Sequence, residues 1–164
     1  MIRRPRPFVY GLCLALLAWT MPASAASCGG GLNPILVIAS GVAFGLYSPG
    51  AKTAATSNGT VNVACTVALG ATLPTFTIAL SAGTYGTFTQ RKMGFGAARL
   101  NYNLYTTAAL STVWGDGTTP SVTQSYVASS GLALITFNVY GSLATHQFAS
   151  LGLYGDSIMV TVSY

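Results

Sequence analysis

The sequence predicts an all-β protein, an antiparallel sandwich of about six to eight short strands. Apolar and polar residues alternate along several stretches, which is the pattern of strands with one buried face. Turns rich in glycine and proline separate these stretches, and none of them keeps the longer period of a helix. Neither a domain boundary nor an internal repeat is visible, so we expect one domain.

A leader that resembles a secretory signal peptide precedes this domain. Three arginines near the start form a basic region, 8–19 is apolar, and Ala23-Ser24-Ala25 resembles a cleavage site. The apolar run is too short to span a bilayer comfortably. We therefore expect a signal peptide over 1–25 and a mature domain over 26–164 without a transmembrane segment.

The mature domain would carry almost no charge. Three of the seven basic residues leave with the leader, so its net charge would be 4 − 2 = +2. Its charged residues are Lys52, Arg91, Lys92, Arg99, Asp116 and Asp156. This composition excludes the dense basic face of a nucleic-acid-binding protein. A surface so poor in charge suits a subunit that is covered in an assembly.

Two cysteines, Cys28 and Cys65, would remain after Cys13 leaves with the leader. In an exported chain they most simply form one disulfide, and two free thiols are the alternative. The bond would close a loop of roughly 40 residues and stabilise the fold by roughly 4 kcal/mol in the chain-entropy model.

Three strands are predicted in the first half of the mature domain. The apolar run over 35–39 predicts a buried strand, and the turn Ser48-Pro49-Gly50 follows it. Asn58-Gly59 is a hairpin signal. The alternating runs 60–66 and 75–80 predict strands with one apolar face. Their inward residues are Val61, Val63, Cys65, Phe76, Ile78 and Leu80.

In the second half, two strong strands are predicted over 100–105 and 132–140. No strand is assigned to the glycine-rich stretch 85–98 or to the polar stretch 121–130, and 142–152 is predicted to be a loop. The inward residues of the two strands are Leu100, Tyr102, Leu104, Ala133, Ile135, Phe137 and Val139.

The last stretch, 156–164, alternates most clearly. Its apolar face would be formed by Ile158, Val160, Val162 and Tyr164, and its other face by Met159, Thr161 and Ser163. No later strand follows to pair beside it. We therefore expect a vacant position in the sheet, and an unpaired apolar edge of this kind invites another chain.

Seven short motifs, in this order and spacing, resemble the spore coat protein U domain, which is found in subunits of archaic chaperone–usher pili of Gram-negative bacteria. They are Phe44-Gly45-x-Tyr47-x-Pro49, Cys65-Thr66, Arg91-x-Met93, Leu100 to Tyr105, Val113 to Gly117, Val139-Tyr140-Gly141 and Gly152-x-Tyr154-x-Asp156. Each motif alone is weak, whereas the ordered set covers essentially the whole mature chain and is highly specific.

The resemblance implies an incomplete immunoglobulin-like sandwich that lacks its last strand and has one disulfide, which maps onto Cys28 and Cys65. It implies a secreted pilus subunit that passes through the periplasm to the cell surface. Its partners would be a periplasmic chaperone, an outer-membrane usher and neighbouring subunits. The chaperone, and later a neighbour's N-terminal segment, would donate the missing strand. The acceptor groove would be lined by Ile158, Val160, Val162 and Tyr164.

One feature departs from the polymerising members of the family. Those carry a donor segment of about a dozen residues, enough for a strand, before the first cysteine. Here only Ala26 and Ser27 would precede Cys28. We therefore expect a tip, minor or terminating subunit, and the alternative is that 29–39 is a displaced donor.

The sequence offers little to catalysis or metal binding. His146 is the only histidine, and the two carboxylates, Asp116 and Asp156, lie forty positions apart, so neither a triad nor a carboxylate pair is indicated. We expect no enzymatic activity, cofactor or metal. Arg91 and Lys92 either flank the groove or pair with Asp156, and the sequence leaves this open.

Three functions are therefore weighed. A structural pilus subunit is favoured. The alternative is a tip adhesin that binds a surface or a glycan, through exposed loops or through aromatic side chains such as Trp114 and Tyr126. An exposed apolar loop tip would favour this alternative. A secreted enzyme is disfavoured, because catalytic groups are missing.

Overall fold

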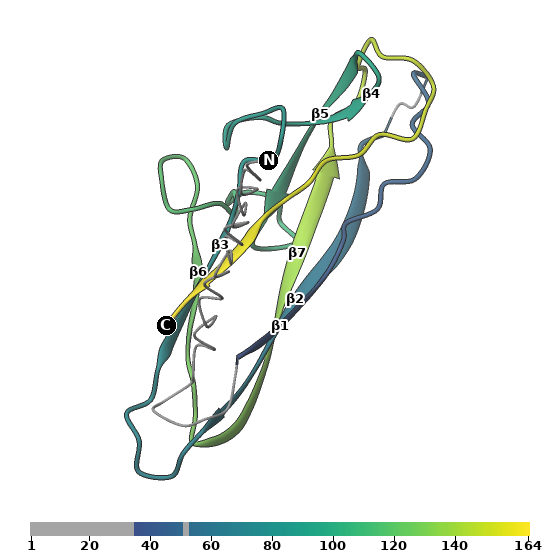
Figure 1. The fold of residues 1–164 in the computed structure, drawn as a ribbon. Helices are drawn as coiled ribbons and strands as arrows, with labels where there is room; N and C mark the ends of the chain where they lie inside the picture. The colour runs from purple at the N-terminus through teal and green to yellow at the C-terminus, as the bar shows by residue number, and fades with distance from the viewer. Residues whose placement is uncertain (1–34, 51–52) are drawn as a thin grey trace, which may run out of the picture.

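The computed structural model describes residues 35–50 and 53–164, and within them the protein is all-β with two antiparallel sheets (Figure 1). The strands are β1 (Leu36–Ser40), β2 (Ala55–Val67), β3 (Thr75–Leu80), β4 (Arg91–Phe95), β5 (Ala98–Tyr105), β6 (Gln124–Val127), β7 (Gly131–Leu143) and β8 (Val160–Ser163). One sheet has the order β1-β2-β7-β5-β4 and the other β6-β3-β8. This confirms the predicted sandwich, which is of the immunoglobulin-like kind. No helix in the described part of the chain is long and apolar enough to cross a membrane.

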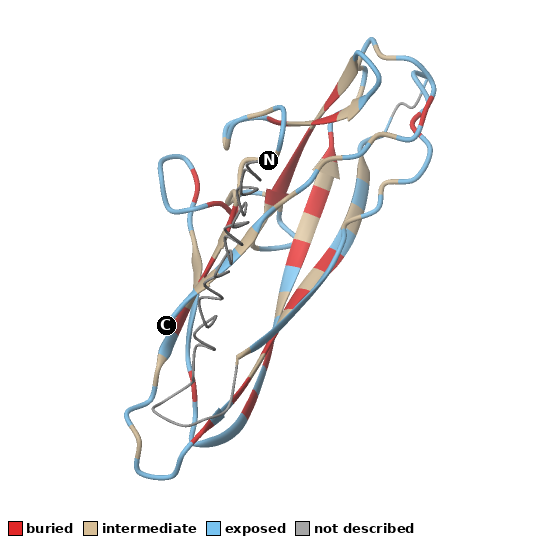
Figure 2. Ribbon diagram, viewed as in Figure 1, coloured by how far each residue is buried: buried red, intermediate tan, exposed pale blue. Residues whose placement is uncertain are grey.

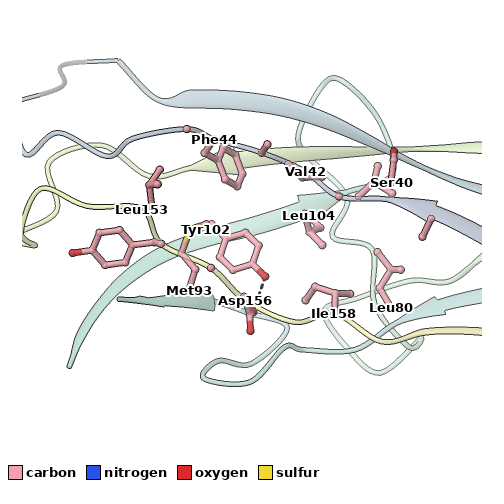
Figure 3. A pocket seen from close by; sticks show the side chains of 17 residues that line it. Ser40, Val42, Phe44, Leu80, Met93, Tyr102, Leu104, Leu153, Asp156 and Ile158 are labelled. Atoms are coloured by element: carbon pink, nitrogen blue, oxygen red, sulfur yellow. Dashed lines mark hydrogen bonds between the residues drawn. The ribbon is translucent and has the colours of Figure 1, made fainter. Parts of the chain in front are cut away.

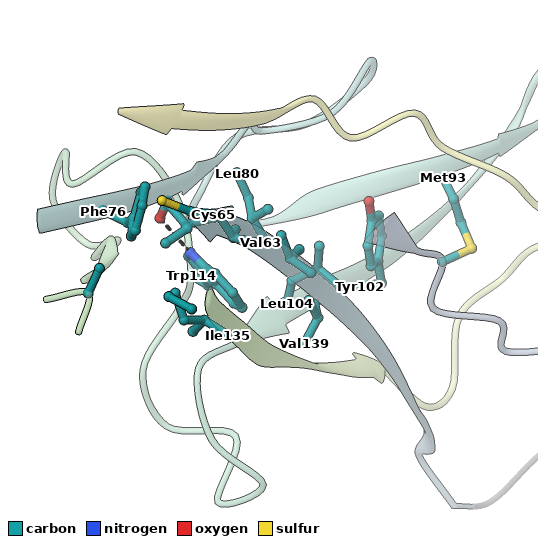
Figure 4. Packing of buried hydrophobic residues seen from close by; sticks show 14 of the residues in the cluster. Val63, Cys65, Phe76, Leu80, Met93, Tyr102, Leu104, Trp114, Ile135 and Val139 are labelled. Atoms are coloured by element: carbon teal, nitrogen blue, oxygen red, sulfur yellow. Dashed lines mark hydrogen bonds between the residues drawn. The ribbon is translucent and has the colours of Figure 1, made fainter. Parts of the chain in front are cut away.

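The core lies between the two sheets, where alternate residues of facing strands interdigitate (Figure 4). Along β2 and β7 buried and more exposed residues alternate, as Figure 2 shows. Trp114 lies fully buried and donates its indole N–H to the carbonyl of Ile78 at 3.0 Å. The predicted inward faces of 60–66, 75–80 and 132–140 are therefore confirmed, with Phe137 only half-buried.

The predicted hairpin at Asn58-Gly59 is wrong, because β2 runs straight through both residues and pairs them with Tyr140 and Val139 of β7. Glycine is needed here for close packing. A Cβ on Gly59 would lie 2.6 Å from the carbonyl oxygen of Ser40. The Asn58-Gly59 pair therefore does not mark a turn. Gly59 is a packing residue that lets the chain at the end of β1 approach β2 closely.

The prediction of a buried strand at 35–39 is wrong in its burial. β1 forms and pairs with β2, but all five of its residues are exposed. Leu36 and Ile38 are 55% and 56% exposed. β1 is the edge strand of its sheet, so within the described residues no strand lies on its other side. β4 and β6 lie in the stretches 85–98 and 121–130, for which the sequence predicts no strand. Both are short edge strands.

Cys65 is buried on the inner face of β2 and is 2% exposed. Cys28 lies outside the described residues, so its bond to Cys65 stays a prediction. We expect Cys65→Ser to lower the free energy of unfolding by roughly 4 kcal/mol, because the cross-link restricts the unfolded chain. Urea unfolding of the subunit will measure this loss, and non-reducing mass spectrometry will identify the linked peptides.

The matched control is Thr66→Ser, one residue further along β2 on the exposed side. It should leave the free energy of unfolding within about 0.5 kcal/mol of that of the parent chain. Two free thiols in the periplasmic protein would contradict the prediction.

Candidate functional site

An apolar groove of about 470 Å³ opens between the two sheets (Figure 3). One side is formed by the chain that continues from β1, residues 41–45, which we call the strap. The other side is formed by residues 153–158, which lead into β8 and which we call the rim. Side chains of β3, β4, β5 and β7 form the floor, namely Leu80, Met93, Tyr102, Leu104 and Val139. The groove thus lies where an edge of one sheet faces an edge of the other.

β8 offers an unpaired backbone edge beside this groove. It pairs only with β3 among the described residues, in a register that places Val160 opposite Leu80. Ser81 N–H donates to the carbonyl of Met159 at 2.9 Å, whereas Leu80 N–H turns away and donates to Gly115 at 3.1 Å. Backbone direction alternates along an antiparallel strand. The N–H and C=O groups of Val160 and Val162 therefore point away from β3, towards the open side.

The four predicted groove residues are divided between the groove, the core beside it and the surface. Ile158 lines the groove, and Val160 and Val162 pack half-buried against the core beyond it. Tyr164 is 49% exposed, and its ring centroid lies 6.2 Å from that of Phe76. Tyr164 therefore borders the sandwich without being buried in it.

The strap rests in a notch made by glycine. Val42 and Phe44 are half-buried and turn towards the core, while Ala43 between them is exposed. A Cβ on Gly141 of β7 would lie 2.4 Å from Cγ1 of Val42 and 2.8 Å from Cζ of Phe44. The Phe44 ring also meets Tyr102 edge-on, with centroids 6.1 Å apart. The strap is therefore held by two side chains that fit over a residue without one.

The rim is tied down by Asp156 and by a backbone bridge. The Asp156 carboxylate accepts hydrogen bonds from the Tyr102 hydroxyl at 2.7 Å and from Thr84 N–H at 2.8 Å. Burial, and then the bond to Asp156, raise the pKa of the Tyr102 phenol above its ordinary value, so the hydroxyl keeps its proton and donates. Gly155 and Gly94 exchange backbone bonds at 2.8 and 3.0 Å. These contacts fix this side of the groove.

Arg91 lies fully buried beneath this region and does not line the groove. Its guanidinium donates to the carbonyl of Ser81 at 2.8 and 3.1 Å, to that of Trp114 at 2.7 Å, and to the side-chain oxygen of Asn103 at 2.6 Å. Burial lowers the pKa of Arg91 from its usual value. Its hydrogen bonds thus join β4 to β5, to Ser81 directly after β3, and to the Trp114 turn. Its neighbour Lys92 is partly exposed.

The remaining polar candidates are separate surface residues. His146 is exposed on the loop after β7. Asp116 is exposed in a turn, where hydrogen bonds from Thr118 lower the pKa of its carboxyl group. No group of three or more potential metal ligands occurs in the described residues. Trp114 is fully buried and cannot present a face to a glycan, whereas Tyr126 is 41% exposed.

Sequence reasoning missed an apolar surface at the end of the sandwich near the β4–β5 turn (Figure 1). We call it the loop end, and its residues are Leu46, Phe95, Phe148, Leu151 and Leu153, all 49% exposed or more. Tyr47 and Gly152 exchange backbone bonds, and Phe95 packs against Gly152, so the three loops meet here. Between positions 148 and 153 the large apolar residues are separated by Ala149, Ser150 and Gly152. They therefore form no continuous apolar run that the sequence would reveal.

Comparison with known proteins gives one family and seven matching chains among the solved structures. The family model described as the spore coat protein U domain matches residues 14–161. One solved structure is 16% identical in sequence, with a TM-score of 0.49. The match covers 79% of this chain and 39% of the chain in that structure. That structure is the CsuC–CsuE chaperone–tip adhesion subunit pre-assembly complex from archaic chaperone–usher Csu pili of Acinetobacter baumannii. The chain therefore spans about two fifths of that chain's length. Comparison with curated proteins found no match.

Proposed function

Because the chain belongs to the spore coat protein U domain family, we propose that it is an exported structural subunit of an archaic chaperone–usher pilus or surface fibre. Its place in the fibre would be reached by donor-strand complementation. A partner lends an extended strand that fills the groove between the strap and β8. This is β-augmentation, in which backbone hydrogen bonds give affinity and alternate side chains fill pockets.

The observation that carries the proposal is the combination of an open backbone edge with an apolar groove. Val160 and Val162 direct backbone donors and acceptors to the open side, and the groove beside them has an apolar floor. A strand with alternating apolar residues would satisfy both at once. A binding site for a small polar substrate would instead need convergent polar groups.

The expected partners follow from this mode of assembly. A periplasmic chaperone would supply the strand first, an outer-membrane usher would exchange it, and a neighbouring subunit would supply the final one. The subunit would pass through the periplasm to a cell-surface pilus. Its role would be structural and not catalytic.

Lysine substitutions on β8 test the groove. In Val160→Lys a charged side chain enters the half-buried inner face, whereas in Thr161→Lys, the matched control, it points to solvent. The probe is a peptide of alternating valine and threonine, whose binding to the immobilised chain is measured by surface plasmon resonance. We expect Val160→Lys to weaken binding at least about tenfold, the equivalent of 1.4 kcal/mol. Equal affinity for both variants would contradict the proposal.

The loop end favours a second candidate, a tip adhesin. Phe148 is 110% exposed, and Leu151 and Leu153 are 59% and 67% exposed, so this end presents an unusual apolar surface. As a tip subunit, the protein would place this surface against an apolar substratum. The short segment expected before Cys28 is in keeping with a terminal position.

We expect Phe148→Ser combined with Leu151→Ser to reduce retention of the folded subunit on polystyrene at least severalfold, because apolar area leaves the contact. The matched control is Leu132→Ser with Leu134→Ser on β7, two leucines 73% and 70% exposed that lie away from the loop end. Equal retention of both double variants would rule out a specific adhesive role for the loop end.

A further inference from the structure

We propose that the strap, residues 41–45, is a displaceable plug of the groove that swings out of its glycine notch when a partner strand enters. This inference rests on the proposed function, because it concerns how the same groove is opened. It assigns a role to the glycine residues on either side of Val42 and Phe44 that complementation by a strand does not by itself require.

Side chains alone dock the strap. It is extended, with Val42 and Phe44 inward and Ala43 outward, yet residues 41–46 make no backbone hydrogen bond with any other described residue. The chain is anchored on both sides of this stretch. Ser40 is paired in β1, and Tyr47 exchanges backbone bonds with Gly152. A short segment between two anchors, held only by two side chains, can leave without breaking a ladder.

Glycine residues lie at both ends of the strap. A Cβ on Gly41 would meet no atom within 4 Å, so no close packing requires glycine there. Gly45 also has open space around it and has a φ of 74°, a conformation that glycine adopts without strain. Both positions therefore provide backbone freedom without serving a close contact. Positions of this kind can absorb the dihedral changes of a hinge.

The place that the strap occupies explains why it would move. Phe44 packs on Tyr102, a floor residue, and Val42 and Phe44 share the notch at Gly141 (Figure 3). In the absence of a partner these side chains shield part of the floor from water. An incoming strand brings apolar side chains of its own to the same floor. The strap and the partner strand therefore compete for one surface.

Glycine variants test the hinge through the rate of strand capture. The chain is immobilised at low density, so that copies cannot associate, and the alternating valine–threonine peptide flows over it. We expect Gly41→Ala to slow association roughly two- to fivefold, since alanine removes backbone freedom of that size. Gly50→Ala, in the turn beyond the strap and outside the groove, is the matched control, because a Cβ there also meets nothing within 4 Å. It should leave the rate unchanged.

A second variant acts in the opposite direction. Gly141→Ala places a methyl group where Val42 and Phe44 now lie, which would expel the strap, so the peptide should associate faster than with the parent chain. Unchanged association rates in both Gly41→Ala and Gly141→Ala, with the peptide still binding, would overturn the plug and leave the proposed function intact. A parent chain that binds no peptide would overturn the proposed function and the plug with it.

Discussion

Arg91→Ala should unfold the subunit. The substitution leaves the buried carbonyl of Trp114 and the half-buried carbonyl of Ser81 without their donor, and the side-chain oxygen of Asn103 keeps only the N–H of Leu104. Each buried polar group left unpaired costs roughly 1–3 kcal/mol, and the vacated space adds to this. A loss of about 5 kcal/mol or more would consume most of the stability of an ordinary domain. Near-ultraviolet circular dichroism, which reports the packing of Trp114, will show the loss.

Lys92→Ala is the matched control for this prediction. Lys92 is the next residue of β4, but it is partly exposed. Truncation of such a side chain should change the free energy of unfolding by no more than about 0.5 kcal/mol. If the two alanine variants unfold at the same denaturant concentration, the hydrogen bonds of Arg91 do not hold β3, β4 and β5 together.

Period-two alternation predicted those strands whose two faces differ in environment. β7 is the clearest case, because Ala133, Ile135 and Val139 face the core while Leu132 and Leu134 face outwards. The outward leucines did not disturb the prediction, because polar and apolar residues alternate clearly further along the strand, from Thr136 to Val139. The alternation of 158–164 also predicted a strand, and β8 forms there at an edge of its sheet among the described residues. That a partner strand pairs with this edge stays a proposal.

What the sequence could not reveal depends on contacts between distant segments. Gly59 reads as a turn residue, and only the crossing of the chain near Ser40 shows that it is a packing residue in a strand. The sequence leaves Arg91 either beside the groove or paired with Asp156. It does not reveal that acceptors on Ser81, Asn103 and Trp114 converge on the guanidinium and make its burial possible. The strap likewise has no local signature, because its notch is a glycine almost a hundred residues away.

In the proposed assembly, the sandwich accepts a further strand in the groove between the strap and β8. Without that strand the apolar floor of the groove is partly exposed to water. Each large apolar side chain that stays exposed loses up to roughly 1.5–3 kcal/mol of the stabilisation that burial would give. Two forms of the 26–164 chain can therefore be compared. One carries the alternating valine–threonine strand after Tyr164, joined by a glycine-rich linker. The other carries a strand of alternating serine and threonine of equal length.

Thermal unfolding of these two monomers, followed by circular dichroism, tests the claim most directly. We predict that the valine–threonine form melts cooperatively and at least about 10 °C above the serine–threonine form, because 1 kcal/mol shifts the midpoint of such a domain by roughly 2–4 °C and several side chains become buried. We also predict that the serine–threonine form aggregates on heating. Two monomeric, cooperative transitions with the same midpoint would show that the sheet is already complete and would contradict the account.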